Sequence, residues 1–281
     1  MSTPMGMAER ITHDGLTFEV RDEGPLDGTP VVLLHGFPER STTWRHVAPI
    51  LHGRGCRTFA PDQRGYSPGA RPRRRRDYRL PLLVDDVAAL VAEIGAPVHV
   101  VGHDWGGAVG YLLAADCPDL VRTLTVAAVP HNAAFIRAMA TSRQGLASWY
   151  MVAFQLPRVP ELLARRAGGP MERALAGGGM SPHELARFRR EIVDAGALPG
   201  ALSWYRAMPL TRPGSVARRV AVPTSLVWGD GDTAVLRSTV LRTGEWVDAD
   251  YRFVELPGVS HWIPTQAPEE LARVVLDRIA S

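Results

Sequence analysis

Short apolar runs and longer amphipathic stretches alternate along the chain. Val31–Leu34 is a continuous apolar run, which is typical of a strand buried on both faces of a parallel sheet. Leu16–Arg21 alternates apolar and polar residues, as a half-exposed edge strand does. The same reading predicts strands over 57–60, 98–101, 123–129, 224–229 and 252–256, and helices over 42–51, 81–94, 105–115 and 268–279. Strands that alternate with helices predict an α/β fold with a mostly parallel central sheet flanked by helices.

The pattern changes after Pro130. Residues 131–211 contain no convincing strand, but they contain helical stretches at 133–140, 161–167 and 183–194 that are separated by loops rich in Gly and Pro. This arrangement predicts a helical insertion over the ends of the strands. We therefore expect a core of residues 1–129 and 213–281 and a helical cap of residues 130–212.

The composition is that of a globular α/β protein. Of the 281 residues 46% are hydrophobic, and no run approaches the roughly 18 apolar residues of a membrane span. Met1–Arg10 lacks the apolar centre of a secretory signal. Cys56 and Cys117 are far apart and suggest reduced thiols. These features predict a cytoplasmic protein that has no membrane partner.

The charge pattern gives no sign of nucleic-acid binding. The net charge is +3, and arginine supplies every basic residue counted because the chain has no lysine. The only dense cluster, at 71–76, is expected to be a solvated loop, since no aromatic platform accompanies it. The nine histidines show no metal-ligand spacing, so no metal is expected.

The stretch from Val98 to Ala108 carries the most specific chemical signal. β-favouring residues run into Gly102-His-Asp-Trp-Gly106-Gly107, and a helix of small residues follows. This is the strand–turn–helix pattern in which a nucleophile is held on a strained turn. The residue at the tip is Asp104. A carboxylate there can displace a leaving group from an sp³ carbon and form an alkyl ester, although an aspartate at this position is also a favoured helix cap.

Two later segments supply a base and an acid at the ends of strands. His261 follows the last predicted strand, and Asp230 and Asp232 follow the one before it. The carboxyl ends of parallel strands share one edge of the sheet, so these side chains are expected near Asp104. His261 would activate water, and one of the two aspartates would orient its ring.

Four motifs together resemble the α/β-hydrolase superfamily, and more narrowly its epoxide hydrolase family. They are His35-Gly-Phe37-Pro38-Glu39, Asp62-Gln-Arg-Gly-Tyr-Ser67, the segment around Asp104, and His261-Trp262. The resemblance runs from about Leu16 to the C-terminus. It implies the α/β-hydrolase fold with a cap inserted after the sixth strand, and it points to Asp232, three residues after Gly229, as the acid.

The resemblance also implies roles for individual residues. The backbone N–H groups of Phe37 and Trp105 would form an oxyanion hole, and the bond before Pro38 would be cis. Tyr150 and Tyr205 correspond to cap tyrosines that protonate the epoxide oxygen. The residues expected to contact substrate are Pro38, Trp105, Trp149, Phe154 and Trp204.

The function expected from these features is hydrolysis of a small hydrophobic epoxide to a vicinal diol by an ester on Asp104, with water and no cofactor. A haloalkane or haloacid dehalogenase with the same Asp–His–Asp set is the main alternative, and a non-catalytic ligand-binding member of the fold is a third. An esterase is disfavoured because attack of Asp104 on an ester gives only an anhydride. Whether the chain pairs as a homodimer is left open.

Overall fold

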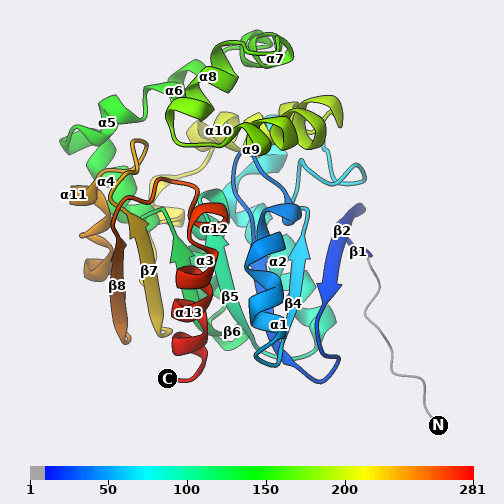
Figure 1. Ribbon diagram of the computed structural model, residues 1–281, viewed down its shortest axis with the longest axis vertical. Coiled ribbons are helices and arrows are strands. Elements are labelled where there is room, and N and C mark those ends of the chain that lie inside the picture. Colours follow the sequence, from blue (N-terminus) through cyan, green and yellow to red (C-terminus); the bar gives the residue numbers. More distant parts are fainter. Residues whose placement is uncertain (1–9) are drawn as a thin grey trace.

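A computed structural model describes residues 10–281 of the chain (Figure 1). Residues 1–9, and with them nearly all of the segment considered above for a signal sequence, lie outside the described residues. Within the described part, no helix is long and apolar enough to cross a membrane.

The core of the fold is an eight-stranded sheet with the spatial order β1-β2-β4-β3-β5-β6-β7-β8. The strands are β1 Arg10–His13, β2 Leu16–Glu23, β3 Thr29–Leu34, β4 Cys56–Pro61, β5 Val98–His103, β6 Val121–Ala127, β7 Thr224–Gly229 and β8 Tyr251–Leu256. Only β1 and β2 run antiparallel to their neighbours, and all pairs from β4 to β8 are parallel. The expected α/β fold with a mostly parallel sheet is confirmed.

Helices cover both faces of the sheet because its central strands are apolar on both sides. The flanking helices are α1 Ala48–His52, α2 Leu80–Ile94, α3 Trp105–Asp116, α11 Arg237–Val240, α12 Ile263–Gln266 and α13 Pro268–Ile279. Along β3, Val32 and Leu34 belong to the core that includes α2 and α3, whereas Val31 and Leu33 belong to the core that includes α1 and α13. This alternation follows from the two-residue period of a strand.

The segment between β6 and β7 is helical and lies across the carboxyl ends of the strands (Figure 1). Its α-helices are α4 Asn132–Thr141, α5 Gln144–Ala147, α6 Trp149–Ala153, α7 Val159–Arg165, α8 Pro170–Gly177, α9 Pro182–Phe188 and α10 Leu198–Ala207. The single helix expected over 183–194 is α9 continued by a π-helical segment, η4 Arg189–Asp194. Short 3₁₀ segments follow α10, at η5 Met208–Leu210 and η6 Pro213–Ser215.

Two local predictions need correction. The helix expected over 42–51 is divided into the 3₁₀ segment η1 Ser41–His46 and the short helix α1. The strand β1 was not predicted, because its four residues, RITH, are too few to show the alternation of a strand. With β1 counted, the helical segment follows the sixth strand, as the resemblance implied. The other 3₁₀ segments are η2 Arg75–Tyr78, η3 Pro118–Leu120 and η7 Thr243–Trp246.

Candidate active site

The turn between β5 and α3 holds Asp104 in an unusual backbone conformation, with φ 49° and ψ −122°. A Cβ on Gly106 would overlap the carbonyl of Leu34, and a Cβ on Gly102 would overlap the backbone of Gly106. The helix can start this close to the sheet only because both positions are glycine. Within the described chain, the Asp104 side chain makes no capping hydrogen bond to α3. The carboxylate is therefore free to face the neighbouring strand ends.

Each oxygen of the Asp104 carboxylate has a distinct neighbour. The backbone N–H of Phe37 donates a hydrogen bond of 2.7 Å to Oδ1. The Oδ2 atom lies 3.5 Å from Nε2 of His261. The Phe37–Pro38 peptide bond in this loop is cis, as the resemblance implied. Trp105 is the first residue of α3, so its N–H is one of the helix-terminal donors that lack an intrahelical partner.

The structure brings Asp232, and not Asp230, to the ring of His261. The Nδ1 atom of His261 lies 2.8 Å from Oδ2 of Asp232. The other oxygen of Asp232 accepts the backbone N–H groups of Ala234 and Val235 at 2.8 and 2.9 Å. These two bonds fix the carboxylate. Asp230 instead accepts the backbone N–H of Gly258, so it closes the neighbouring turn.

His261 and Asp104 shift each other's pKa. Burial lowers the pKa of His261, but the charge of Asp232 and the hydrogen bonds to Asp104 and Asp232 outweigh burial and raise this pKa well above its usual value. Burial raises the pKa of Asp104, but the hydrogen bond and charge of His261 outweigh it and hold this pKa below its usual value. The charged forms of His261 and Asp104 therefore favour each other.

Two phenols from the helical segment lie near the nucleophile: Tyr150 lines the same cavity as Asp104, whereas Tyr205 packs against Trp105 and is not among the residues that line this cavity. Burial, followed by the charge of Asp104, raises the pKa of Tyr150 on α6 and of Tyr205 on α10 above the usual tyrosine value. Tyr205 packs edge-on against Trp105 and Phe37, with ring centroids 5.1 Å apart in each pair. The Tyr150 ring lies 6.1 Å from the Tyr205 ring. Both phenols therefore remain protonated and can act as donors at neutral pH.

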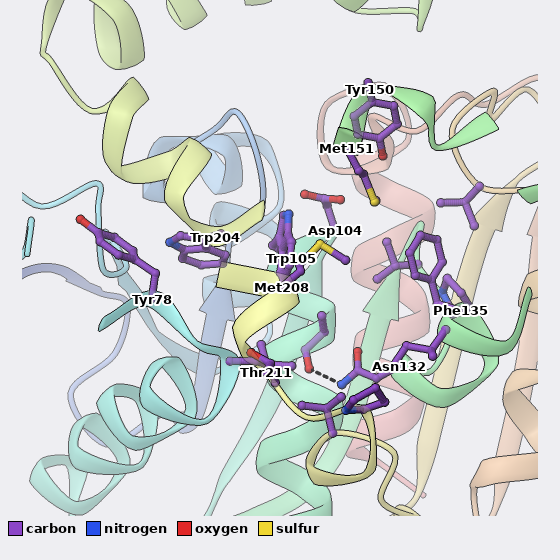
Figure 2. Close-up of a pocket in the computed structure, with 18 residues that line it drawn as sticks. Tyr78, Asp104, Trp105, Asn132, Phe135, Tyr150, Met151, Trp204, Met208 and Thr211 are labelled. Carbon is purple, nitrogen blue, oxygen red and sulfur yellow. Dashed lines mark hydrogen bonds between the residues drawn. The ribbon is translucent and has the colours of Figure 1, made fainter. Parts of the chain in front are cut away.

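A cavity of about 190 Å³ opens beside Asp104 (Figure 2). Its wall is mostly apolar and includes Trp105, Phe135, Met151, Trp204, Met208 and Val235. Two of its polar side chains are already engaged: Asn132 donates to the carbonyl of Ala108, and the Tyr78 hydroxyl donates to the carbonyl of Pro72. The nucleophile Asp104 and the hydroxyl of Tyr150 are polar groups of the wall that a bound molecule could contact. The cavity therefore suits a small, mostly apolar molecule.

Comparison with known proteins identifies the family. A sequence model of the alpha/beta hydrolase family matches residues 31–274. The chain belongs to the alpha/beta hydrolase family. This hydrolase is 31% identical to the AB hydrolase superfamily protein YfhM of Bacillus subtilis, over 95% of its own length and 96% of that protein. It is also 31% identical to Epoxide hydrolase 3 of Xenopus tropicalis, over 95% of its own length and 76% of that protein.

The fold agrees with the same family. A solved structure from a study of novel epoxide hydrolases in metagenomes from hot environments is 28% identical and has a TM-score of 0.83. The match covers 97% of this hydrolase and 98% of that chain. The resemblance to epoxide hydrolases that the four motifs indicated is confirmed by these relatives.

The aromatic residues expected to contact substrate are distributed unevenly in this hydrolase. Trp105 and Trp204 line the cavity. Phe154 packs against Phe37 and Tyr205, behind the cavity wall. Trp149 is 66% exposed and is not among the residues that line the cavity. Because adjacent residues on a helix point about 100° apart, Trp149 faces away when Tyr150 faces inward.

Pro38, which was expected to contact substrate, lies instead at a separate small recess beside Glu39 and Met180. Two residues that do line the cavity were not predicted from the sequence. Phe135 and Asn132 of α4 line the cavity, although nothing in the spacing of that helix marks them. They reach the cavity because α4 begins just beyond the carboxyl end of β6.

Two histidines near the nucleophile contact backbone groups of the hydrolase rather than the cavity. The Nε2 atom of His103 lies 2.9 Å from the carbonyl oxygen of His261. The Nε2 atom of His35 accepts the N–H of Gln63, and burial lowers the pKa of His35 to about 3. Neither ring faces the cavity. No group of three or more His, Cys, Asp or Glu side chains within residues 10–281 is arranged to hold a metal ion.

Proposed function

We propose that this protein is an epoxide hydrolase that forms an alkyl ester on Asp104. The observation that carries the proposal is the pairing of a carboxylate on the turn after β5 with two buried phenols, Tyr150 in the wall of the same cavity and Tyr205 against Trp105. A carboxylate attacks an sp³ carbon rather than a carbonyl group, and phenols supply the proton that an opening epoxide requires. Relatives named epoxide hydrolases support the same substrate class.

In the first step, an oxygen of Asp104 bonds to one epoxide carbon while the carbon–oxygen bond of the ring breaks. The released alkoxide takes a proton from Tyr150 or Tyr205. The bond from Phe37 N–H to Oδ1 orients the carboxylate for this attack. The products of the step are a hydroxyalkyl ester of Asp104 and a phenolate. The proton that His261 gives up restores the phenol, so the imidazole is neutral for the next step.

In the second step, His261 takes a proton from water as the water oxygen attacks the ester carbonyl carbon. Esterification removes the negative charge of Asp104, which is one cause of the raised pKa of His261. The pKa of the imidazole therefore falls when the base is needed. The N–H groups of Phe37 and Trp105 stabilise the oxyanion. The acyl carbon–oxygen bond then breaks, and the departing alkoxide takes the proton held by His261 to give the diol. The Asp104 carboxylic acid passes its proton to His261, which restores the starting site.

Within this proposal, residues 130–212 act as a helical cap that carries Tyr150 and Tyr205 over a core of residues 1–129 and 213–281. Asp104, His261 and Asp232 act as a catalytic triad, and water is the only co-reactant. Pro38 shapes the oxyanion loop, Trp105 and Trp204 contact the substrate, and Phe154 supports Phe37 and Tyr205 behind the cavity wall. Cys56 and Cys117 are not joined in a disulfide, which supports a cytoplasmic location.

The test is intact-protein mass spectrometry of His261→Gln, which lacks the base but keeps the nucleophile. Incubation with a terminal epoxide should add the mass of the whole epoxide, and Asp104→Ala should show no addition. A haloalkane is used in parallel. If the variant gains an alkyl group from the haloalkane and nothing from epoxides, the protein is a dehalogenase instead.

A further inference from the structure

The helices α5, α6 and α7 carry an apolar face toward solvent. Of the eleven large hydrophobic side chains that are exposed within residues 10–281, seven lie between residues 146 and 163. They are Leu146, Trp149, Val152, Leu156, Val159, Leu162 and Leu163. They lie on these three short helices and, in the case of Leu156, on the turn between α6 and α7. We call these seven side chains the outer apolar face.

The inward side of α5 is polar, whereas α6 packs Tyr150 and Met151, and α7 packs Ala164, against the core. Gln144 is fully buried, and its amide donates to Ser148 and to the carbonyl of Ala234. The amide of Gln155 donates to the carbonyl of Tyr205. These polar groups hold the segment on the protein. The outer apolar face is therefore not needed for packing. Leu146 and Val152 are 75% and 73% exposed, and contact with a partner would remove this apolar surface from water.

Positive charge surrounds this face. Residues 132–169 contain five arginines, at 137, 143, 158, 165 and 166, and a single acidic residue, Glu161. All five arginines are exposed, and none forms an ion pair with any residue from 10 to 281. Glu161 is paired with Arg206 of α10 at 2.7 Å. The segment thus presents uncompensated positive charge beside exposed Leu, Val and Trp.

We propose that the outer apolar face docks this protein on the surface of an anionic lipid bilayer. Leu and Trp side chains at the headgroup boundary with arginines around them are the composition of an interfacial membrane-binding helix. A second copy of the chain fits less well, because a twofold contact would set the five arginines against themselves. In Figure 1 the three helices lie along the edge of the molecule farthest from the C-terminus, where they can meet a flat surface together.

The position of the face suggests what docking does. Tyr150 and Met151 of α6 line the cavity (Figure 2), while Trp149 and Val152 of the same helix belong to the outer apolar face. Only the thickness of α6 therefore separates the cavity from that face. An apolar epoxide dissolved in the bilayer would have a short path to Asp104. This consequence rests on the proposed function, whereas docking itself does not.

The experiment is flotation of the protein with vesicles of phosphatidylcholine and phosphatidylglycerol, against vesicles of phosphatidylcholine alone. We expect binding to the mixed vesicles that weakens as salt is raised. Trp149 should shift its emission to shorter wavelength on binding, as shown by the difference between the parent protein and Trp149→Phe. Flotation needs no turnover, so its failure would be distinct from failure of the proposed enzyme activity.

Two sets of matched variants separate the apolar and charged contributions. The triple variant Leu146→Ser, Val152→Ser, Leu162→Ser should lose binding at least about tenfold, whereas Leu26→Ser, Leu210→Ser, Leu241→Ser, which changes other exposed leucines, should bind normally. Arg143→Glu, Arg165→Glu, Arg166→Glu should lose at least about tenfold, whereas Arg73→Glu, Arg74→Glu, Arg75→Glu in the exposed arginine run should lose much less.

Thermal melts followed by circular dichroism would show whether each variant is folded. Two results would overturn the proposal. One is equal loss of binding in the control and test sets, which would indicate nonspecific charge attraction. The other is absence of flotation with the mixed vesicles. If a stable dimer is then seen by light scattering and the Leu146, Val152 and Leu162 triple variant disrupts it, the face is a contact between two copies instead.

Discussion

The substitution Asp232→Asn separates the two proposed steps. In the structure, one oxygen of Asp232 accepts two backbone N–H groups and the other lies 2.8 Å from Nδ1 of His261. An asparagine can keep both backbone bonds through its amide oxygen. Its NH₂ group then faces Nδ1, which must become an acceptor. The proton of the neutral ring moves to Nε2, the atom that would take a proton from water.

The substitution is expected to slow hydrolysis of the ester but not its formation. The corresponding change in a serine protease triad lowers kcat by about 10⁴-fold, and we expect a loss of that order here. Ester formation requires Asp104 and the phenols, so it should continue. Epoxide added to excess variant should be consumed once per active site, and the ester should accumulate in intact-protein spectra. Asp230→Asn is the matched control and should keep the parent rate, because Asp230 bonds Gly258 rather than His261.

The reasoning would be refuted by either of two results. If Asp232→Asn retains more than about a tenth of the steady-state rate, the carboxylate does not fix the tautomer of His261. If the rate falls but no ester accumulates, the side chain is needed before the ester forms. A thermal melt of the variant close to that of the parent would exclude misfolding as the cause.

Three further predictions follow from the same geometry. Tyr205→Phe and Tyr150→Phe should each slow ester formation about 10- to 100-fold in stopped-flow single turnovers, and an unchanged rate in both would remove the phenols from the mechanism. Gly106→Ala should destabilise the fold by about 2 kcal/mol or more in urea unfolding, because its methyl group overlaps the carbonyl of Leu34; a neutral result would contradict the packing. The pKa of His261 is higher in the folded than in the unfolded state, which stabilises the fold. This stabilisation is complete below about pH 6.5 and is lost as pH rises through the higher folded pKa. Urea unfolding should therefore show stability declining above that pH in the parent and a flatter profile in His261→Gln, and parallel profiles would argue against the raised pKa.

Much of the fold and of the candidate site is readable from the sequence because local rules act there. The glycines around Asp104 mark a turn in which helix and strand nearly touch, and that turn is observed. His261 and Asp232 each follow a strand of one parallel sheet, so topology alone brings them to one edge. The choice of Asp232 over Asp230 needed the family pattern, since both follow the same strand. Only the structure shows the two backbone N–H groups that hold Asp232.

The helical segment over the sheet is where sequence reasoning is weakest. A period of three or four residues shows that Leu146, Trp149 and Val152 share a face, but it does not say whether that face points inward. The structure turns the polar side, with Gln144 and Ser148, toward the core. Trp149 thus appears in a list of expected substrate contacts and is found in solvent. The expectation of no membrane partner rested on the lack of an apolar run long enough to span a bilayer. The proposed docking on a bilayer surface would not require such a run.

The most direct test of the central claim is one turnover in H₂¹⁸O with enzyme in excess over epoxide. If the diol oxygen comes from Asp104, the first diol contains no ¹⁸O, and the peptide that contains Asp104 gains one ¹⁸O atom. If water attacks the epoxide directly, the first diol carries ¹⁸O and the Asp104 peptide remains unlabelled. That second result would contradict the ester on Asp104 and the mechanism built on it.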